Sequence, residues 1–327
     1  MRKFFGSVIV VGVFLWWLSS VSPGTIVIEN GDSVQSVATK LRSEKIVRSE
    51  TLVKIAYRLF GSGEHVFPGT VVVGPSCSIR CVIREITSAQ PSIVRLRLTE
   101  GQDIRDLARV LESKKIGTAA ELIALVGSPA SVPTKHADFA AEFSFLASAP
   151  KNISLEGYLF PDTYDFSAGV TPEQVVRTML KNFDRRVTSE MRERAAKQDR
   201  TIHEVVTMAS ILDLEVRGAE DQRMVADILW RRISRGMGLQ VDSSVKYLTK
   251  SAGVFTTKQE RATVSLWNTY KYKGLPLGPI GNPGVSAIEA ALNPKANEYW
   301  FYLTSPDGTV HYARTLEEHV SNKRFLK

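Results

Sequence analysis

Residues 201–218 read TIHEVVTMASILDLEVRG and decide the fold of the C-terminal half of the chain. Thr201 and Glu204 have the spacing of a capping box, in which the two side chains satisfy free N–H groups of the first helical turn. Apolar residues then recur at helical intervals around a broad face, and Gly218 is a typical helix stop. We therefore predict a helix over residues 202–217 that is buried on most sides.

Two carboxylates interrupt the apolar face of this predicted helix. At about 100° per residue, Asp213 falls inside the apolar stripe and Glu215 falls outside its edge, so periodicity by itself favours Asp213 as the buried acid. Glu215 lies in the last helical turn, where the negative end of the helix dipole and apolar neighbours raise the pKa of a carboxyl. A general acid needs that shift. The alternative is that either carboxylate pairs with an arginine, such as Arg217 or Arg223.

The segments after this helix supply a second helix and a short polar stretch. Residues 220–235 are amphipathic, and a solvated basic face is expected for Arg231, Arg232 and Arg235. In residues 239–242 polar and apolar side chains alternate, so Gln240 and Asp242 share one face of a short strand. The alternative is that Asp242 caps a helix that starts at Ser243.

Three further segments have patterns typical of a cleft and its support. Residues 268–284 hold four glycines and three prolines among aromatic residues, which predicts a long, stiff loop that forms a cleft wall. Residues 155–166, LEGYLFPDTYDF, predict an extended segment that turns at Pro161 and Asp162. Three residues of this segment have two interpretations: Tyr158, Asp162 and Tyr164. Either they line a polar cleft, or the two tyrosines belong to the core and Asp162 is a turn residue. Residues 299–313 predict a terminal hairpin.

The N-terminal half contains an internal repeat. Residues 28–47 match residues 98–117 at a constant offset of 70 positions. Each copy predicts a strand, a glycine turn and an amphipathic helix, with plausible N-caps at Ser33 and Asp103. The pattern fits either a repeated folding unit without a ligand or a glycan-binding module. Residues 130–150 lack sustained periodicity and are expected to connect this half to a new domain.

The first residues have the pattern of a membrane anchor. Residues 4–21 form a stretch of 18 residues without charge, close to the roughly 20 that cross a bilayer. Arg2 and Lys3 precede this stretch and no basic residue follows it before Lys40, so the N-terminus is expected in the cytoplasm. The alternative is a cleaved signal peptide, although Ser20-Val21-Ser22 is a poor cleavage site.

Composition narrows the partners and cofactors. The formal net charge of +8 suits an anionic partner, and the expected location outside the cytoplasm argues against nucleic acid. Cys77 and Cys81 are the only cysteines, and at helical spacing they would need a strained bond, so we expect a free or optional pair. The five histidines are scattered, and HEVVT at residues 203–207 is not HExxH. We expect no metal and no cofactor.

Five segments, in this order behind the apolar N-terminus, resemble the YceG-like (MltG) family of endolytic murein transglycosylases: LEGYLFPDTYDF, ASILDLEVRG, GMGLQVDSSVKY, NTYKYKGLPLGPIGNPG and SPDGTVHYARTLEEH. The resemblance runs from about residue 24 to the C-terminus. It implies a LysM-like glycan-binding module near the N-terminus and a catalytic acid at Glu215, which overrules the periodicity argument for Asp213. Two positions depart from the family pattern, at the cleft lip: Ser243 stands in place of a proline, and Val216 in place of a small residue.

The resemblance also implies a mechanism with one carboxyl group. Glu215 would protonate the glycosidic oxygen and then take the proton of the muramoyl C6 hydroxyl, which attacks C1 and leaves a 1,6-anhydro end. Ordinary glycosidases need two carboxylates at a defined separation. The expected substrate-binding or orienting residues are Tyr158, Asp162, Tyr164, Gln240, Asp242, Tyr270, Asn282 and His311.

These inferences combine into one expected organisation. The fold class is α+β, with a mixed α/β catalytic domain, and the expected segments are a cytoplasmic tip and anchor over 1–22, a LysM-like module over 23–92, a second strand-helix unit and connector over 93–150, and the catalytic domain over 151–327. The protein would sit in the cytoplasmic membrane as a single-pass protein, face the periplasm or outside, and act on peptidoglycan glycan strands beside peptidoglycan synthases.

Two other functions stay open at this point. A non-catalytic wall-binding or scaffold protein would use the glycan-binding unit and need no acid. A conventional muramidase would use Asp213 as the second carboxylate, but residues two apart on a helix point about 160° away from each other.

Overall fold

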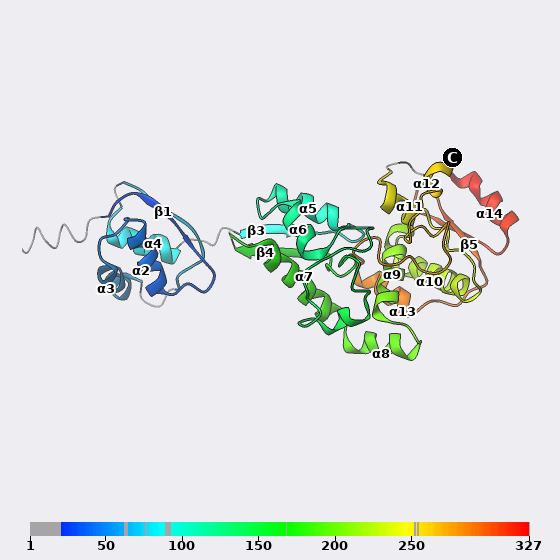
Figure 1. Ribbon diagram of the computed structural model, residues 1–327, viewed down its shortest axis with the longest axis horizontal. Helices are drawn as coiled ribbons and strands as arrows, with labels where there is room; N and C mark the ends of the chain where they lie inside the picture. Colours follow the sequence, from blue (N-terminus) through cyan, green and yellow to red (C-terminus); the bar gives the residue numbers. More distant parts are fainter. Residues whose placement is uncertain are drawn as a thin grey trace, which may run out of the picture. The chain divides into compact units, whose positions relative to one another are not determined.

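The computed structural model describes residues 21–61, 65–75, 77–88, 93–167, 169–251, 253 and 255–326 (Figure 1). The described chain is a mixture of helices and small sheets, which confirms the predicted α+β class. It divides into two compact units. Unit 1 comprises the chain up to Arg95 together with Tyr164–Val170, and unit 2 comprises Leu96–Thr163 and the chain from Thr171 onward. The domain boundaries at residues 22, 92 and 150 stay predictions.

Unit 1 is built on an antiparallel pair of strands. Strand β1 (Gly24–Ile28) pairs with β2 (Gly69–Val73), with Gly24 opposite Val73. Alternate residues of each strand are buried, which is the pattern of a sheet covered on one face. Helices α2 (Val34–Ser43) and α3 (Glu50–Phe60) connect the strands, and α4 (Ile79–Ser88) follows β2. Apolar side chains of all five elements form one core.

The predicted repeat is confirmed in its backbone detail. Strand β3 (Ile93–Arg97) leads into α5 (Ile104–Ser113) as β1 leads into α2. The turn glycines Gly31 and Gly101 have φ of 94° and 77°, a region that few other residues adopt. The predicted N-caps, Ser33 and Asp103, both accept hydrogen bonds from backbone N–H groups of the first helical turn. The two segments are therefore copies of one folding motif.

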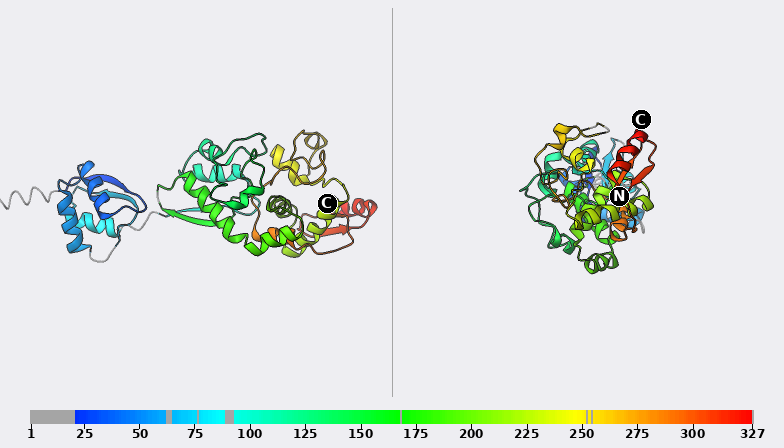
Figure 2. Two further views of the ribbon diagram at one scale, coloured as in Figure 1. Left: turned by 60° about the horizontal axis from the view of Figure 1, so that its bottom comes forward. Right: turned by 90° about the vertical axis from the view of Figure 1, so that its right-hand side faces the viewer.

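Unit 2 is a helical body with one hairpin. Helix α9 (Ile202–Glu215) is its central element, because nine of its residues are buried and it packs against four other helices. Figure 2 shows the ribbon from two further sides. Two of those helices are α10 (Ala219–Ser234) and α13 (Val285–Leu292). The others are α11 (Asp242–Thr249) and α8 (Ser189–Lys197).

The remaining elements surround this body or connect it to unit 1. Strand β4 (Thr163–Ser167) pairs with β3, and the chain passes between the units along these two strands. The predicted terminal hairpin is confirmed, with β5 (Phe301–Thr304) antiparallel to β6 (Val310–Ala313). The other helices are α6 (Ala119–Val126), α7 (Pro172–Arg186), α12 (Lys258–Arg261) and α14 (Leu316–Asn322), with 3-10 turns at Ser144–Ser148 and Lys323–Leu326.

Helix α9 begins as predicted and ends two residues early. The capping box of Thr201 and Glu204 is present. Val216 has extended backbone, with φ of −143° and ψ of 151°, and its side chain is buried. Gly218 is the N-cap of α10 and not the stop of α9, so that part of the prediction was wrong. The Thr304 hydroxyl donates to the Glu215 carbonyl oxygen at 3.1 Å, so a distant strand satisfies the helix end.

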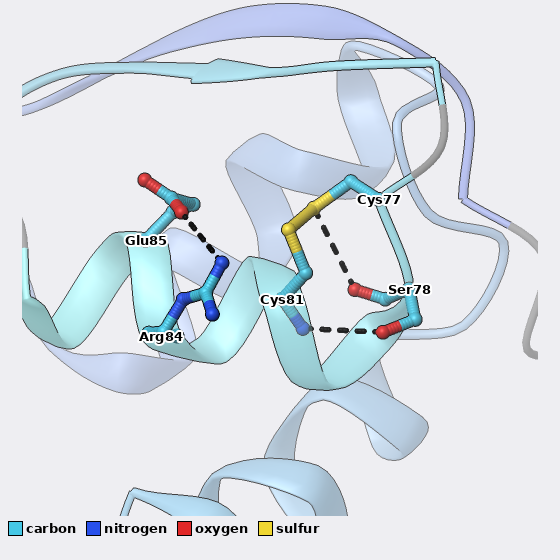
Figure 3. The surroundings of a disulfide bond; sticks show 5 residues. All are labelled: Cys77, Ser78, Cys81, Arg84 and Glu85. Atoms are coloured by element: carbon cyan, nitrogen blue, oxygen red, sulfur yellow. Dashed lines mark hydrogen bonds and ion pairs between the residues drawn. A yellow bond between two sulfur atoms is a disulfide. The ribbon is translucent and has the colours of Figure 1, made fainter.

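Cys77 and Cys81 form a disulfide (Figure 3). The expectation of a free or optional pair was wrong, because it assumed that both residues lie on one helix. Cys77 precedes the first turn of α4, and the two Cα atoms are 5.4 Å apart, within the normal range for a disulfide. The bond ties the start of α4 to the chain that leaves β2.

The predicted anchor is not visible in this fold, because residues 1–20 lie outside the described part of the chain. Within the described part, every helix is too short or too polar to cross a bilayer.

Candidate active site

Glu215 is the last residue of α9, and two donors hold its carboxyl group. The backbone N–H of Ser243 donates to Oε1 at 3.2 Å. The hydroxyl of Tyr302, on β5, donates to Oε2 at 3.2 Å. The residue as a whole is half-buried. The two donors, one at each oxygen, fix the orientation of the carboxyl group.

Burial raises the pKa of Glu215 above the ordinary value for a glutamate. The hydrogen bonds from Ser243 and Tyr302 favour the charged form and oppose this shift, whereas the nearby charge of Asp242 adds to it. The net effect keeps the proton on the carboxyl to higher pH than in water. This environment is the one expected of a general acid.

Asp242 lies beside this acid and is itself held by two hydroxyls. The Tyr270 and Thr256 hydroxyls each donate to Oδ1 at 2.6 Å. Tyr270 belongs to the 268–284 loop, so the predicted cleft wall does contribute a side chain close to Glu215. Burial, followed by the hydrogen bond to Asp242, raises the pKa of the Tyr270 hydroxyl, which therefore stays a donor.

Gln240 and Asp242 do not share a strand, and that prediction was wrong. Gln240 has a left-handed backbone with φ of 52°, and its N–H donates to the Thr269 carbonyl oxygen at 3.2 Å. Asp242 is the first residue of α11, with Val241 as N-cap. The alternation in residues 239–242 is thus a tight bend before a helix. Gln240 is exposed and remains free to contact a ligand at the edge of the site.

Asp213 faces a different side of α9. Its Oδ2 accepts the N–H of Gly284 at 2.7 Å, and its Oδ1 accepts from Gln222 at 2.9 Å. Burial is the main cause that raises the pKa of Asp213 to about 6, and the charge of Glu100 adds to it. Asp213 is half-buried and not fully buried as periodicity suggested. Its hydrogen bonds join α9 to α10 and to the start of α13, and they are separate from those that hold Glu215.

Arg232 is buried, which corrects the expected solvated basic face. Its guanidinium donates to the Trp300 carbonyl oxygen at 2.9 Å and 2.6 Å, and to the Leu239 carbonyl oxygen at 2.8 Å. Burial lowers its pKa, and the nearby Tyr302, Glu215 and Tyr270 groups oppose that shift. The amphipathic pattern of α10 could not reveal this, because the acceptors come from the hairpin and from the chain after α10.

Two predicted substrate contacts lie in the protein interior. Tyr158 has no exposed surface, and its hydroxyl is 2.9 Å from His203 Nδ1. Asn282 is also fully buried: its Oδ1 accepts the N–H groups of Gly157 and Leu159, and its Nδ2 donates to Gln102 and Glu156. Neither side chain offers surface to a ligand in this structure, so we revise both to structural roles.

Three other predicted residues, Asp162, Tyr164 and His311, are not among the groups that hold Glu215. Burial opposes ionisation of Asp162, but hydrogen bonds from Thr163, Asn182 and Arg186 outweigh it and lower its pKa. Tyr164 is buried in unit 1, stacked on Phe166.

His311 lies on β6 opposite Leu303, whereas Tyr302 lies opposite Tyr312, so His311 points to the other face of the hairpin from Tyr302. There its ring stacks on Phe325 with centroids 3.9 Å apart. Among the described residues, no cluster of His, Cys, Asp and Glu could hold a metal ion.

Sequence reasoning missed two groups that hold Glu215 and one buried carboxyl elsewhere in the interior. Tyr302 and the N–H of Ser243 hold the acid, but both are far from it in the chain. Glu156 is 1% exposed, and burial raises its pKa to about 8. It accepts hydrogen bonds from the Ile104 N–H, the Asn282 amide and the Tyr247 hydroxyl. A glutamate inside the apolar run LEGYLF was the signal that could have indicated it.

The fold and the site define a protein with an oriented carboxyl group of raised pKa at the end of the central helix of a helical body. A profile of the YceG-like family matches residues 26–325, and the chain belongs to this family. That confirms the resemblance found in the sequence motifs.

Individual relatives agree with this membership. The endolytic murein transglycosylase of Bacillus subtilis (strain 168) is 28% identical over 96% of this chain and 90% of the relative. That of Streptococcus pneumoniae serotype 2 (strain D39) is 26% identical over 91% of this chain, which spans 57% of the relative's length. A crystal structure of a YceG-like protein from Listeria monocytogenes has a TM-score of 0.62 and 27% identity, and covers 92% of this chain and 99% of that one.

Proposed function

We propose that this protein is an endolytic murein transglycosylase that cleaves within peptidoglycan glycan strands, with Glu215 as its catalytic acid. The observation that carries the proposal is the carboxyl of Glu215: burial raises its pKa, two donors orient it, and part of the residue is open to solvent. The names of the bacillary and pneumococcal relatives support the same reaction.

The proposed reaction needs one carboxyl group in two states. Protonated Glu215 gives its proton to the glycosidic oxygen between the muramoyl C1 and the next sugar, and the C1–O bond breaks. The carboxylate that remains takes the proton of the C6 hydroxyl on the same muramoyl ring, and that oxygen bonds to C1. The products are a free hydroxyl on one strand and a 1,6-anhydro end on the other. Glu215 regains its proton and no water is consumed.

A hydrolytic muramidase fits the geometry less well. It needs a second carboxylate free to activate water or attack the sugar. Asp213 is engaged by Gly284 and Gln222 on another side of α9. Asp242 lies closer, but Tyr270 and Thr256 both donate to its Oδ1. A non-catalytic wall-binding protein would leave the raised pKa of Glu215 without a use.

Product analysis separates the three functions. Purified glycan strands are incubated with a soluble form, residues 24–327, and the fragments are analysed by mass spectrometry. We expect anhydro ends; reducing ends would indicate the muramidase, and intact strands the binding protein. Glu215→Gln should abolish cleavage, because the amide cannot donate an acidic proton, although its one carbonyl oxygen still accepts from one of the two donors, Ser243 or Tyr302. Cleavage by this variant at the normal rate would refute the assignment.

The finer parts of the site are also proposals. Asp242 and Tyr270 are joined by a hydrogen bond beside Glu215, and we assign them to orienting the substrate. Gln240 is exposed at the bend before Asp242 and is assigned to contact with the glycan. Asp162, Tyr164 and His311 are kept only as candidates for contacts with more distant sugars.

Location and accessory binding complete the proposal. We assign residues 1–22 to a single membrane anchor and the rest of the chain to the outer side of the cytoplasmic membrane, on the basis of the charge pattern of the first 40 residues. The strand-helix-helix-strand core of unit 1 supports its assignment as a LysM-like glycan-binding module. Peptidoglycan synthases are the proposed neighbours, because they supply the nascent strands.

A further inference from the structure

The C-terminal hairpin contacts the acid at two points. On β5, the Tyr302 hydroxyl donates to Glu215 Oε2 at 3.2 Å. Two residues further along the same strand, Thr304 Oγ1 donates to the Glu215 main-chain oxygen at 3.1 Å. Side chains two apart on a strand lie on the same face, so one face of β5 meets the end of α9. The carboxyl and the backbone of Glu215 are therefore held by the same strand.

The strand that carries Tyr302 is itself fixed to the helical body. Arg232, on α10, donates twice to the Trp300 carbonyl oxygen, and its guanidinium lies 5.2 Å from the centre of the Phe301 ring. The neighbouring Arg231 donates to the Tyr299 carbonyl oxygen. Residues 299–301 are thus tied to α10 immediately before Tyr302. The backbone that carries Tyr302 is thus positioned by contacts with α10.

We infer that Tyr302 is a positioning residue for the general acid, holding Glu215 Oε2 so that the acid faces the glycosidic oxygen and stabilising the carboxylate after proton delivery. The inference rests on the proposed function, in which Glu215 is the acid. The Ser243 N–H occupies one position on Oε1 and Tyr302 one position on Oε2. A carboxyl held at both oxygens keeps one orientation, and the remaining lone-pair positions are left for the substrate.

The direction of the electrostatic effect follows from the donor. A hydroxyl that donates to a carboxylate favours the charged form, so Tyr302 lowers the pKa of Glu215 relative to burial alone. Loss of the hydroxyl would raise that pKa further. The rate of an acid-catalysed step falls as pH rises through the pKa of the acid, so the alkaline limb of the pH profile would move to higher pH.

The test compares two tyrosines of the hairpin. Tyr312 lies directly opposite Tyr302 in the strand register, and its hydroxyl donates to Asp221 Oδ1 at 2.6 Å. Tyr302→Phe and Tyr312→Phe each remove one hydroxyl-to-carboxylate hydrogen bond from the same face of the same hairpin. Only Tyr302→Phe removes one from Glu215. Steady-state rates on purified glycan strands are measured across pH, with thermal unfolding of both variants as a control for folding.

We expect Tyr302→Phe to lower kcat by about 10- to 100-fold, the usual range for a hydrogen bond to a charged group, with KM nearly unchanged. The alkaline limb should move to higher pH, and this readout does not depend on the fraction of folded enzyme. Tyr312→Phe should change neither. The inference would be overturned if Tyr302→Phe changed neither kcat nor the alkaline limb of the pH profile. It would also be overturned if Tyr302→Phe and Tyr312→Phe lowered kcat equally and neither shifted the alkaline limb. If Glu215→Gln remains active, the proposed function fails; if only Tyr302→Phe behaves normally, this inference alone fails.

Discussion

Glu156 is a buried carboxyl that the reaction does not use. Its exposed fraction is 1%, and burial together with the nearby charge of Asp103 raises its pKa to about 8. Hydrogen bonds from Ile104 and Tyr247 oppose that shift without cancelling it. At neutral pH the folded chain therefore carries a proton here. Glu215 is half-buried, whereas Glu156 is almost fully buried and joins the start of α5 to α11 through its hydrogen bonds.

This proton makes folding stability depend on pH. An unfolded glutamate loses its proton near pH 4.3, whereas folded Glu156 keeps it to about pH 8, so the folded state binds more protons between these values. The free energy of unfolding should then fall as pH rises, by at most about 1.4 kcal/mol per pH unit from this group. Glu156→Gln cannot titrate and should flatten that slope. Urea unfolding at pH 5, 6 and 7 measures the free energy of unfolding of the wild type and of Glu156→Gln. The same pH dependence in both proteins would contradict the prediction.

At the scale of elements, the last turn of α9 provides hydrogen-bond acceptors for the starts of two other helices. Helices α11 and α13 both begin after residues without a capping side chain, Val241 and Gly284. Glu215 accepts an N–H from the first turn of α11, and Asp213 accepts the N–H of Gly284 at the start of α13. Two acids two residues apart point to different sides of α9 and reach different helix starts. Their spacing thus fixes the positions of three helices around the site.

The role of Asp213 in this junction predicts a loss of stability without a change of product. Asp213→Ala removes the acceptor of the Gly284 N–H and should lower the free energy of unfolding by about 1–2 kcal/mol, a typical cost for a lost helix cap. Asp213→Asn keeps an acceptor oxygen and should cost less. Both variants should still give anhydro ends in mass spectrometry. A stable Asp213→Asn variant that no longer cleaves glycan would place Asp213 in the chemistry instead.

Local signals predicted where elements begin, and distant contacts decided the rest. The capping box of Thr201 and the caps at Ser33 and Asp103 are satisfied within one helical turn, so their sequence pattern was sufficient. The early end of α9 and the burial of Arg232 depend on Thr304 and Trp300, which lie 89 and 68 positions away. The assignment of Glu215 as the acid stays a prediction that came from motif resemblance, because periodicity favoured Asp213. Tyr302 had no local signal at all.

At the scale of the whole molecule, the disulfide lies in unit 1 and the candidate acid in unit 2. The proposed anchor precedes unit 1, and Val21 already pairs with Val47 inside it. If the anchor is retained in the membrane, unit 1 follows it directly, without a linker. We propose that such an anchor confines cleavage to the zone near the membrane where new strands emerge, which would limit strand length.

This arrangement predicts where the protein is found in cells. The full chain should sediment with membranes and resist extraction by high salt, because a span of about 20 apolar residues holds it without help from charge. A form that starts at residue 24 behind a cleavable signal should be soluble. Fractionation and immunoblotting measure both. A freely diffusing form that restores normal glycan-strand length in cells lacking the protein would refute the confinement hypothesis.

The hydrogen bond between Glu215 and Tyr302 also bears on how the protein is made. The two residues are 87 positions apart, and the tyrosine comes from the hairpin that follows all the helices of the body except α14. A ribosome builds the acid well before the strand that holds it. An unfinished chain therefore carries a carboxyl without its partner, and a fully aligned site exists only once the hairpin has been added and has folded onto α10. With Glu215 as the proposed acid and Tyr302 as its proposed positioning residue, we expect activity only once the molecule is nearly complete.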